Sequence, residues 1–258
     1  MRIREIIGAI ERRAALRWQE GFDNSGLQVG DPEAEAKGIL ITLDITEEIV
    51  DEAIAKGCNL IVSHHPLIFK ALKQVGFSTY QQRCVVKAVK NDICIYSAHT
   101  SLDNAFGGVN HRIAVILGLG ETEWLGSPAD SESGSGLIGM LEKPLIDRDF
   151  FLRTKEAFGV DALRCSRPEG RLIRKVAVCG GAGAFLLPEA IRKGADCFVC
   201  GEFHYHDYFE NSGVLLCELG HYQSEQYTKD LLASIIGEAF PDADVRLSQI
   251  NTNPIQYL

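Results

Sequence analysis

The sequence lacks two features that would place the protein in a membrane or on nucleic acid. Its N-terminus, MRIREIIGAIERR, mixes isoleucines with charged residues, so it has no uninterrupted apolar run of the kind found in a signal peptide or a membrane span. Positive charge is also scarce, because 26 basic residues against 35 acidic ones leave a formal charge of −9. We therefore expect a cytoplasmic protein that binds neither membranes nor nucleic acid broadly.

The composition also excludes fibrous and disordered proteins. Of the 258 residues, 46% are apolar and 24% are charged, which is the balance of a globular chain. A chain of this length can bury one large core or two small ones.

The cysteines and histidines of the sequence do not have the spacing of a zinc finger. The chain has eight cysteines, but only Cys197 and Cys200 form a Cys-x-x-Cys pair, and no second pair or Cys/His partner stands at zinc-finger spacing. This pair lies inside the strand-like run CFVC. We predict that most of the cysteines, this pair included, are reduced thiols buried in a core.

The order of predicted elements is typical of an α/β protein. Isoleucines at i, i+3, i+4, i+7 spacing predict an amphipathic N-terminal helix. Thr46 before two glutamates is typical of a helix N-cap, and Gly57 of the corresponding stop. Apolar runs predict strands over residues 39–43, 60–63, 93–97, 176–179, 197–200 and 214–217. Other helices are expected over residues 109–117, 147–158 and 224–240 and before Gly194. Strands that alternate with helices indicate parallel sheets.

Only SPADSESGSG, residues 127–136, has the composition of a linker. It predicts a domain boundary near residue 125, with one α/β half over residues 1–125 and a second over residues 126–258. The first half would carry His64, His65 and Asp103, and the second His221 and Glu225.

An internal repeat supports this division. Residues 37–66 align without a gap on residues 174–203 at an offset of 137, with six of thirty pairs identical. Every predicted strand, helix and helix-stopping glycine coincides. Two generic strand-helix-strand units can also resemble each other by chance. In each half, however, the next strand is followed by a histidine and a carboxylate four residues apart: His99 with Asp103, and His221 with Glu225.

Histidines and carboxylates therefore gather directly after three predicted strands: His64 and His65 after LIVS, His99 and Asp103 after IYS, and His221 and Glu225 after LCE. Sites in α/β sheets form at the carboxyl ends of strands. Imidazole and carboxylate ligands together suit Zn²⁺, Fe or Mn²⁺ better than Mg²⁺ or Ca²⁺. Taken singly, each residue is also compatible with an ordinary hydrogen-bonding role. The convergence of the set favours metal binding.

Neighbouring side chains of a regular strand diverge, so His64 and His65 would serve two nearby ions more easily than one. Asp103 and Glu225 each have two oxygens and could bridge ions about 3.5–4 Å apart, the spacing of two-metal hydrolytic sites.

Five runs together resemble the Nif-three-like dinuclear-metal family, which is also labelled GTP cyclohydrolase I type 2-like. They are WQEGFDNSGLQVGD, SHHP, HTSLDNAFGGVN, GEFHYHD and GHYQSE, and they cover nearly the whole chain in the right order. The resemblance implies two metal ions bound by His64, His65, Asp103, His221 and Glu225. It implies two similar, interlinked α/β halves with the ions between them at strand C-terminal ends. It also implies a toroidal homohexamer, and a substrate such as GTP or a related purine compound.

One departure from the family pattern concerns HYHD at residues 204–207, where the family usually has a single histidine near His206. We expect His204 to face solvent. His206 follows a strand end and is a candidate for lining the inner cavity of the ring that the resemblance implies. His206 and His99 are the candidate catalytic proton carriers, because imidazole titrates near neutral pH.

The run GGAGAF, residues 180–185, lies between a predicted strand and a helix and could present backbone N–H groups to a phosphate. It lacks the Walker lysine and does not fit Gly-x-Gly-x-x-Gly. A tight strand-to-helix turn is the better interpretation.

Three functions follow as hypotheses. In the first, the protein is a dinuclear metal-dependent hydrolase, in which an activated water attacks an electrophilic carbon or phosphorus. In the second, the ions serve structure, storage or regulation in a non-catalytic adaptor protein. Five ligands for two ions leave coordination positions open, which favours catalysis. DNA threading through a ring is the third, and the net charge of −9 opposes it.

Overall fold

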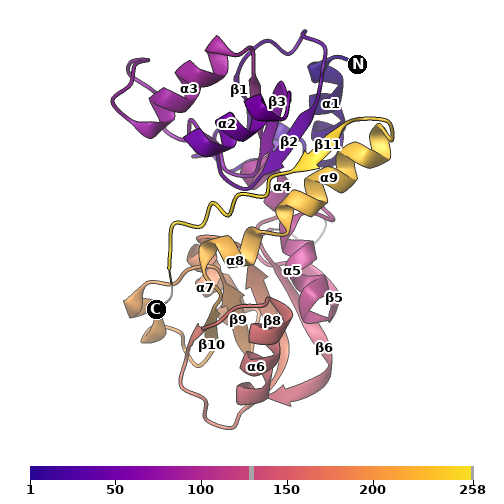
Figure 1. Ribbon diagram of the computed structural model, residues 1–258. Helices are drawn as coiled ribbons and strands as arrows, with labels where there is room; N and C mark the ends of the chain where they lie inside the picture. The colour runs from indigo at the N-terminus through magenta and orange to yellow at the C-terminus, as the bar shows by residue number, and fades with distance from the viewer. Residues whose placement is uncertain (128–130, 257–258) are drawn as a thin grey trace. The chain divides into compact units, whose positions relative to one another are not determined.

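The computed structural model describes residues 1–127 and 131–256 and divides them into two compact α/β units (Figure 1). Unit 1 contains Met1–Leu102 and Thr228–Pro254, and unit 2 contains Asp103–Tyr227 and residues 255–256. Each unit has its own sheet, so the mixed α/β class predicted from the sequence is confirmed. No helix in the described ranges is both long and apolar enough to cross a membrane.

Unit 1 is built on a five-stranded sheet with the order β1-β4-β3-β2-β11. β2, β3, β4 and β11 are parallel, and β1 pairs antiparallel with β4 at the edge. Its strands are β1 (Gly26–Val29), β2 (Ile39–Thr42), β3 (Leu60–Ser63), β4 (Cys94–Ser97) and β11 (Val245–Leu247). Its helices are α1 (Ile3–Arg13), η1 (Leu16–Trp18), α2 (Glu47–Ala55), α3 (Tyr80–Lys90), the first four residues of α4 (His99–Asp103) and α9 (Thr228–Ala239).

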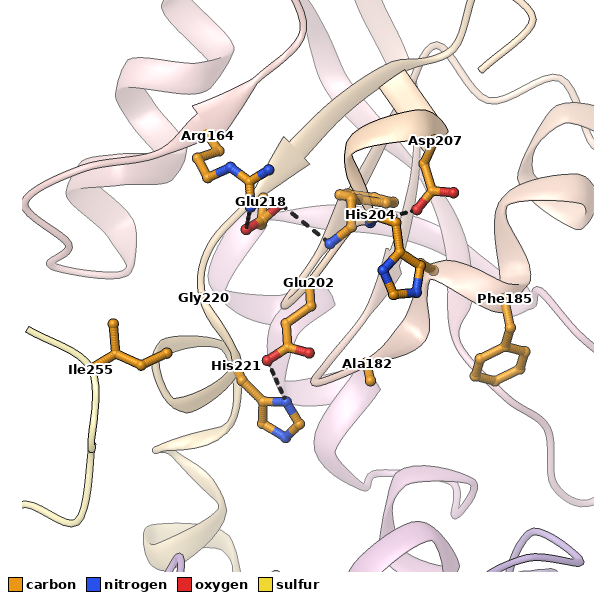
Figure 2. A pocket seen from close by; sticks show the side chains of 12 residues that line it. Arg164, Ala182, Phe185, Glu202, His204, Asp207, Glu218, Gly220, His221 and Ile255 are labelled. Atoms are coloured by element: carbon orange, nitrogen blue, oxygen red, sulfur yellow. Dashed lines mark hydrogen bonds and ion pairs between the residues drawn. The ribbon is translucent and has the colours of Figure 1, made fainter. Parts of the chain in front are cut away.

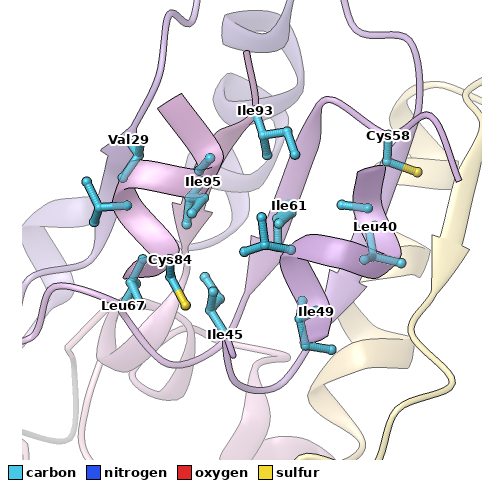
Figure 3. Close-up of a cluster of buried hydrophobic side chains, with 14 residues drawn as sticks. Val29, Leu40, Ile45, Ile49, Cys58, Ile61, Leu67, Cys84, Ile93 and Ile95 are labelled. Atoms are coloured by element: carbon cyan, nitrogen blue, oxygen red, sulfur yellow. The ribbon is translucent and has the colours of Figure 1, made fainter. Parts of the chain in front are cut away.

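Helices cover both faces of this sheet, which explains why β2, β3 and β4 are continuous buried runs without polar alternation. α2 and α3 pack on the face formed by Leu40, Ile61 and Ile95 (Figure 3). α1 and α9 contact each other, and α9 contacts β2 and β11. The predicted cap of α2 is confirmed, because the Thr46 side chain accepts from the Ile49 N–H and Gly57 follows in the left-handed conformation with φ 68°.

Unit 2 is built on a six-stranded sheet with the order β5-β6-β8-β9-β10-β7. β8, β9 and β10 are parallel, whereas β5, β6 and β7 each join antiparallel. Its strands are β5 (Leu119–Trp124), β6 (Leu137–Ile146), β7 (Arg164–Cys165), β8 (Leu172–Cys179), β9 (Cys197–Cys200) and β10 (Leu215–Glu218). Its helices are α5 (Val109–Leu117), α6 (Asp147–Ala157), η2 (Gly183–Leu186), α7 (Leu187–Arg192), η3 (Tyr205–Tyr208) and α8 (His221–Glu225).

The core of unit 2 lies on both faces of β8 and β9. α7 packs against the face that carries Ala177 and Phe198. Val176 and Val178 point the other way and are equally buried, and α5 and α6 contact β8. The left-handed Gly118 ends α5, as the sequence predicts.

The aligned residues 37–66 and 174–203 form strand-helix-strand units of matching register. In unit 1, Ile39 pairs with Leu60, and in unit 2 the aligned Val176 pairs with Cys197. Each unit continues into a third parallel strand followed by a five-residue helix, α4 or α8.

The division into units differs from the predicted boundary near residue 125. That position lies inside unit 2, between β5 and β6, which pair with each other in one sheet. The chain instead leaves unit 1 after Leu102 and returns at Thr228, so Asp103 belongs to unit 2. The predicted linker joins β5 to β6, and its residues 128–130 lie outside the described residues.

The last helix also differs from the prediction of one helix over residues 224–240. α8 ends at Glu225 and α9 begins at Thr228, where the chain passes from unit 2 to unit 1. The two helices bury different faces: Glu225 is buried in unit 2, and Leu232 and Ile236 in unit 1. Helical periodicity does not reveal this break, because residues on both sides of it favour helix.

The cysteine prediction is confirmed, because all eight are free thiols and only Cys165 is exposed. Cys197 and Cys200 are fully buried in β9, and burial raises the pKa of Cys200 to about 12. The Cys-x-x-Cys pair is therefore part of the core of unit 2.

Candidate metal centre

Three histidines meet at the carboxyl ends of β3 and β4 in unit 1. His64 and His65 follow Ser63, the last residue of β3, and His99 begins α4 just after β4. One ring nitrogen of each lies within 4.8 Å of one from each of the other two. His64 is fully buried, and His65 and His99 are partly exposed.

His64 and His65 approach each other because the chain leaves the strand at this point. The His65 N–H donates to the Leu43 carbonyl at 2.9 Å, and the Ser63 hydroxyl donates to the His65 carbonyl at 2.8 Å. Both residues lie in a bend, and their ring centroids are 4.8 Å apart. The divergence expected of neighbours in a regular strand therefore does not apply here.

Carboxylates hold two of these rings by their Nδ1 atoms, that of Asp23 buried and that of Asp44 partly exposed. His65 Nδ1 lies 2.6 Å from Asp44 Oδ1, and His99 Nδ1 lies 2.6 Å from Asp23 Oδ1. A carboxylate on Nδ1 sets the tautomer and directs Nε2 away from it, as in histidines that bind metals.

Both carboxylates are ionised in this setting. Burial acts to raise the pKa of Asp23, but hydrogen bonds with His99, Thr100 and Ser25 outweigh it and hold the pKa well below its usual range. The pKa of Asp44 is also lowered, because its contact with His65 outweighs the effect of burial.

Unit 2 carries the other candidate ligands. His221 and Glu225 are the first and last residues of α8, and His221 Nε2 lies 3.2 Å from Glu225 Oε2. His221 Nδ1 lies 3.1 Å from Glu202 Oε1, which is a third histidine–carboxylate pair (Figure 2). A carboxylate oxygen of Asp103 lies within 4.8 Å of one of Glu225.

The Asn110 side chain connects the segments that hold Asp103 and Glu225. Its Nδ2 donates to the Asp103 carbonyl at 3.0 Å, and its Oδ1 accepts from the Gly180 N–H at 3.0 Å. Asn110 is 1% exposed, so both bonds are shielded from water. It thereby links the end of α4 to the turn after β8.

Gly181 lies against the His221–Glu225 pair. A Cβ on Gly181 would stand 2.4 Å from Glu225 Oε1 and 3.2 Å from His221 Nε2. The backbone N–H groups of this turn are already used, since that of Gly181 donates to Ser224 Oγ at 3.0 Å and that of Gly180 to Asn110. The GGAGAF run is thus a tight turn after β8, as the sequence favours, and it brings the backbone close to the acidic pair.

A cavity of about 600 Å³ in unit 2 opens beside His221 (Figure 2). The Arg164–Glu218 ion pair lies on its wall, and so do Phe185 and His204. His206 is exposed on η3, where its ring contacts Tyr205 and Phe209, and it is not part of the lining. His204 is exposed at the wall of this cavity, as expected of a solvent-facing side chain.

The structure thus brings His64, His65 and His99 together in unit 1, and Asp103, His221 and Glu225 in unit 2. Sequence reasoning did not single out the residues that support them: Asp23, Asp44, Asn110, Gly181 and Glu202. Three of these lie in runs that carry the family resemblance: Asp23 in WQEGFDNSGLQVGD, Asn110 in HTSLDNAFGGVN and Glu202 in GEFHYHD. The family motifs therefore include these residues, but the sequence does not show which histidine each carboxylate contacts.

Comparison with known proteins identifies the family of the chain. A family model described as Duf34/NIF3 (NGG1p interacting factor 3) matches residues 1–254. The chain belongs to this family. The resemblance seen in the sequence is therefore confirmed.

Curated relatives of this NIF3 chain include a Clostridium perfringens protein that is 38% identical over 229 residues, covering 87% of both chains. A Clostridium acetobutylicum protein is 31% identical over 265 residues and covers 100% of this chain and 99% of its own. Both are named GTP cyclohydrolase 1 type 2 homolog. NIF3-like protein 1 of Drosophila melanogaster is 33% identical over 263 residues, covering 97% of this chain and 87% of its own.

Solved structures match over the full length. A hypothetical protein of Staphylococcus aureus superposes with a TM-score of 0.91 at 28% identity and covers 100% of this chain and 99% of its own. A Bacillus cereus protein related to NIF3 gives a TM-score of 0.90 at 25% identity, with the same coverage.

Proposed function

We propose that this NIF3 chain is a dinuclear metal-dependent hydrolase. His64 and His65 from unit 1 and Asp103, His221 and Glu225 from unit 2 would hold two divalent transition-metal ions. The family supports this assignment, and so do the donor types, because imidazole nitrogens combined with carboxylate oxygens suit Zn²⁺, Fe²⁺ or Mn²⁺.

One observation carries the proposal: each of three histidines, one of them in unit 2, has a carboxylate beside its Nδ1 atom. His65, His99 and His221 each have a carboxylate oxygen within about 3 Å of Nδ1. A carboxylate on Nδ1 is the usual means of orienting a metal-binding histidine and of making its other nitrogen a better ligand.

The histidines of the site would have two different roles, metal binding and proton transfer. Two bound ions would supply Lewis acidity and an activated water. His65 and His221 would be held as ligands by Asp44 and Glu202. His99, fixed by the buried Asp23, would carry a proton beside His64 and His65.

We further propose a purine nucleotide or a related compound as the substrate, hydrolysed at the ring or at a phosphate. This follows the name of the curated relatives. The cavity beside His221 has the size of a small-molecule site and polar groups on its wall.

Elemental analysis of protein expressed with ample metal tests the binding step, with two ions per chain as the expected result. A screen of nucleotides with each metal restored to stripped protein then tests turnover, and His221→Ala serves as the inactive control. One ion or none per chain would disprove the dinuclear site. Two ions without turnover of any compound would favour the alternative, a non-catalytic metal-binding or adaptor protein.

A further inference from the structure

Two cysteines face each other on the edge of the sheet in unit 2. β7 pairs antiparallel with β10, and the register places Cys165 directly opposite Cys217. Cys165 is exposed and Cys217 is fully buried. Neither thiol belongs to the candidate metal centre.

The hydrogen-bond pattern shows which kind of pair they form. The Ser166 N–H donates to the Leu216 carbonyl at 2.9 Å, one position before the pair along β10. Hydrogen-bonded and non-hydrogen-bonded pairs alternate along an antiparallel ladder, so Cys165 and Cys217 occupy a non-hydrogen-bonded position. Facing Cα atoms at such positions are about 4.5 Å apart and their side chains lean together, which falls within the range that a disulfide spans.

We propose that Cys165 and Cys217 are a site of reversible oxidation, at which hydrogen peroxide converts them to a cross-strand disulfide. The exposed Cys165 thiol reacts first: its sulfur takes one peroxide oxygen to become a sulfenic acid, and the remaining oxygen leaves as water. The Cys217 sulfur then attacks the sulfenic sulfur, the S–S bond forms, and the hydroxyl leaves as a second water with the Cys217 proton. Two thiols are oxidised and one molecule of hydrogen peroxide is reduced.

Both steps should be favoured by a higher pH. Burial, and then the charge of Asp147, raise the pKa of the Cys165 thiol that reacts first. Burial, and then the neighbouring Cys165, raise the pKa of the Cys217 thiol, so little thiolate is present at neutral pH. The facing position compensates for this by holding the two sulfurs together. We therefore expect disulfide formation to accelerate as the pH rises.

The disulfide would fix β7 at the wall of the cavity. β7 has only two residues, and Arg164, which precedes Cys165, forms its ion pair with Glu218, which follows Cys217. A short edge strand opens locally with little cost, and a covalent link to β10 removes that freedom. The Arg164–Glu218 pair shown in Figure 2 would then stay closed on the wall of the cavity beside His221.

Cys197 provides the matched control. It is buried on the neighbouring strand β9, close to Cys217, but its direct partner across the parallel ladder is Leu215. Cys197→Ala should leave the oxidation unchanged. Cys165→Ser changes an exposed side chain and should abolish it without affecting the fold.

The test treats the whole purified protein with hydrogen peroxide and maps its peptides without reduction. We expect a peptide pair joined through Cys165 and Cys217, a loss of two of the eight free thiols, and full recovery with dithiothreitol. In the oxidised form, amide exchange of residues 164–166 should slow. The site does not depend on metal, so metal-stripped protein should behave in the same way.

Three outcomes would overturn the proposal. Cys165 could become sulfinic acid with Cys217 still reduced, it could link two chains to each other, or it could join Cys197. Each is visible in the same peptide map.

Discussion

His221 and Glu225 face each other across one turn of α8, with Nε2 of the first 3.2 Å from Oε2 of the second. Glu225 is 4% exposed, and a buried carboxylate is stable only when it is paired or hydrogen-bonded. An imidazole and a carboxylate this close are also a suitable pair of metal ligands, so this pair is the most informative place for substitutions.

Glu225→Ala should lose more metal than Glu225→Gln if Glu225 bridges two ions, because the amide keeps one coordinating oxygen. Elemental analysis after matched dialysis measures the difference. Equal metal content in the two variants would argue against a bridging role.

Gly181→Ala should weaken metal binding and destabilise the protein. Gly181 has φ 58°, and an added Cβ would stand 2.4 Å from Glu225 Oε1. Gly194→Ala is a matched control, because Gly194 has φ 69° with nothing within 4 Å of an added Cβ. Both variants should lose about 1 kcal/mol of stability from backbone strain. Only Gly181→Ala should also lose metal, so equal metal contents would contradict the predicted clash.

His99→Ala should still bind two ions, about 10- to 100-fold more weakly, as expected when a supporting residue is lost. His221→Ala should lose one ion under the same dialysis. His99 lies with His64 and His65, and its Nδ1 is held by Asp23. If His99→Ala loses an ion as completely as His221→Ala, the site has six ligands.

Asp147→Asn should destabilise unit 2 in a pH-dependent way. The buried carboxylate accepts from the backbone N–H groups of Arg148, Glu169 and Arg171. Burial acts to raise the pKa of Asp147, but these bonds outweigh it and lower the pKa below its ordinary value of 3.8. The ionised form is therefore favoured by folding, and its contribution is present above that value and lost as the pH falls through the folded pKa.

At neutral pH the amide should cost about 1–3 kcal/mol, because its NH₂ group replaces an acceptor among these donors. Denaturant unfolding at pH 7 and near pH 3 measures the change, and the difference from the native protein should shrink at the lower pH. Asp149→Asn, at an exposed position of the same first turn, should have little effect at either pH.

We expect a ring of six chains in solution, on the family resemblance. Light scattering at micromolar protein concentration measures this directly. A mass of 28.4 kDa, that of one chain, would contradict the ring.

Much of the fold could be predicted because its signals are local. β2, β3 and β9 are apolar runs in the sequence, and Thr46 and Gly57 mark the ends of α2 through their own backbone preferences. β1 and β11 were not predicted, because short edge strands carry little hydrophobic pattern. β5 was missed for the same reason, since most of its residues are exposed.

The sequence by itself determined that histidines and carboxylates follow the central strands. Each strand is an apolar run that can be recognised locally, and the polar residues come directly after it in the chain. Only the tertiary structure decided which groups meet. Asp23 reaches His99 across 76 residues of sequence, because β1 and β4 are neighbours in the sheet order. The tertiary structure also placed Asp103 in unit 2. It ended α8 at Glu225, because Glu225 is buried in unit 2 whereas Leu232 and Ile236 of α9 are buried in unit 1. Pairings of this kind depend on strand order and packing, and no local pattern encodes them.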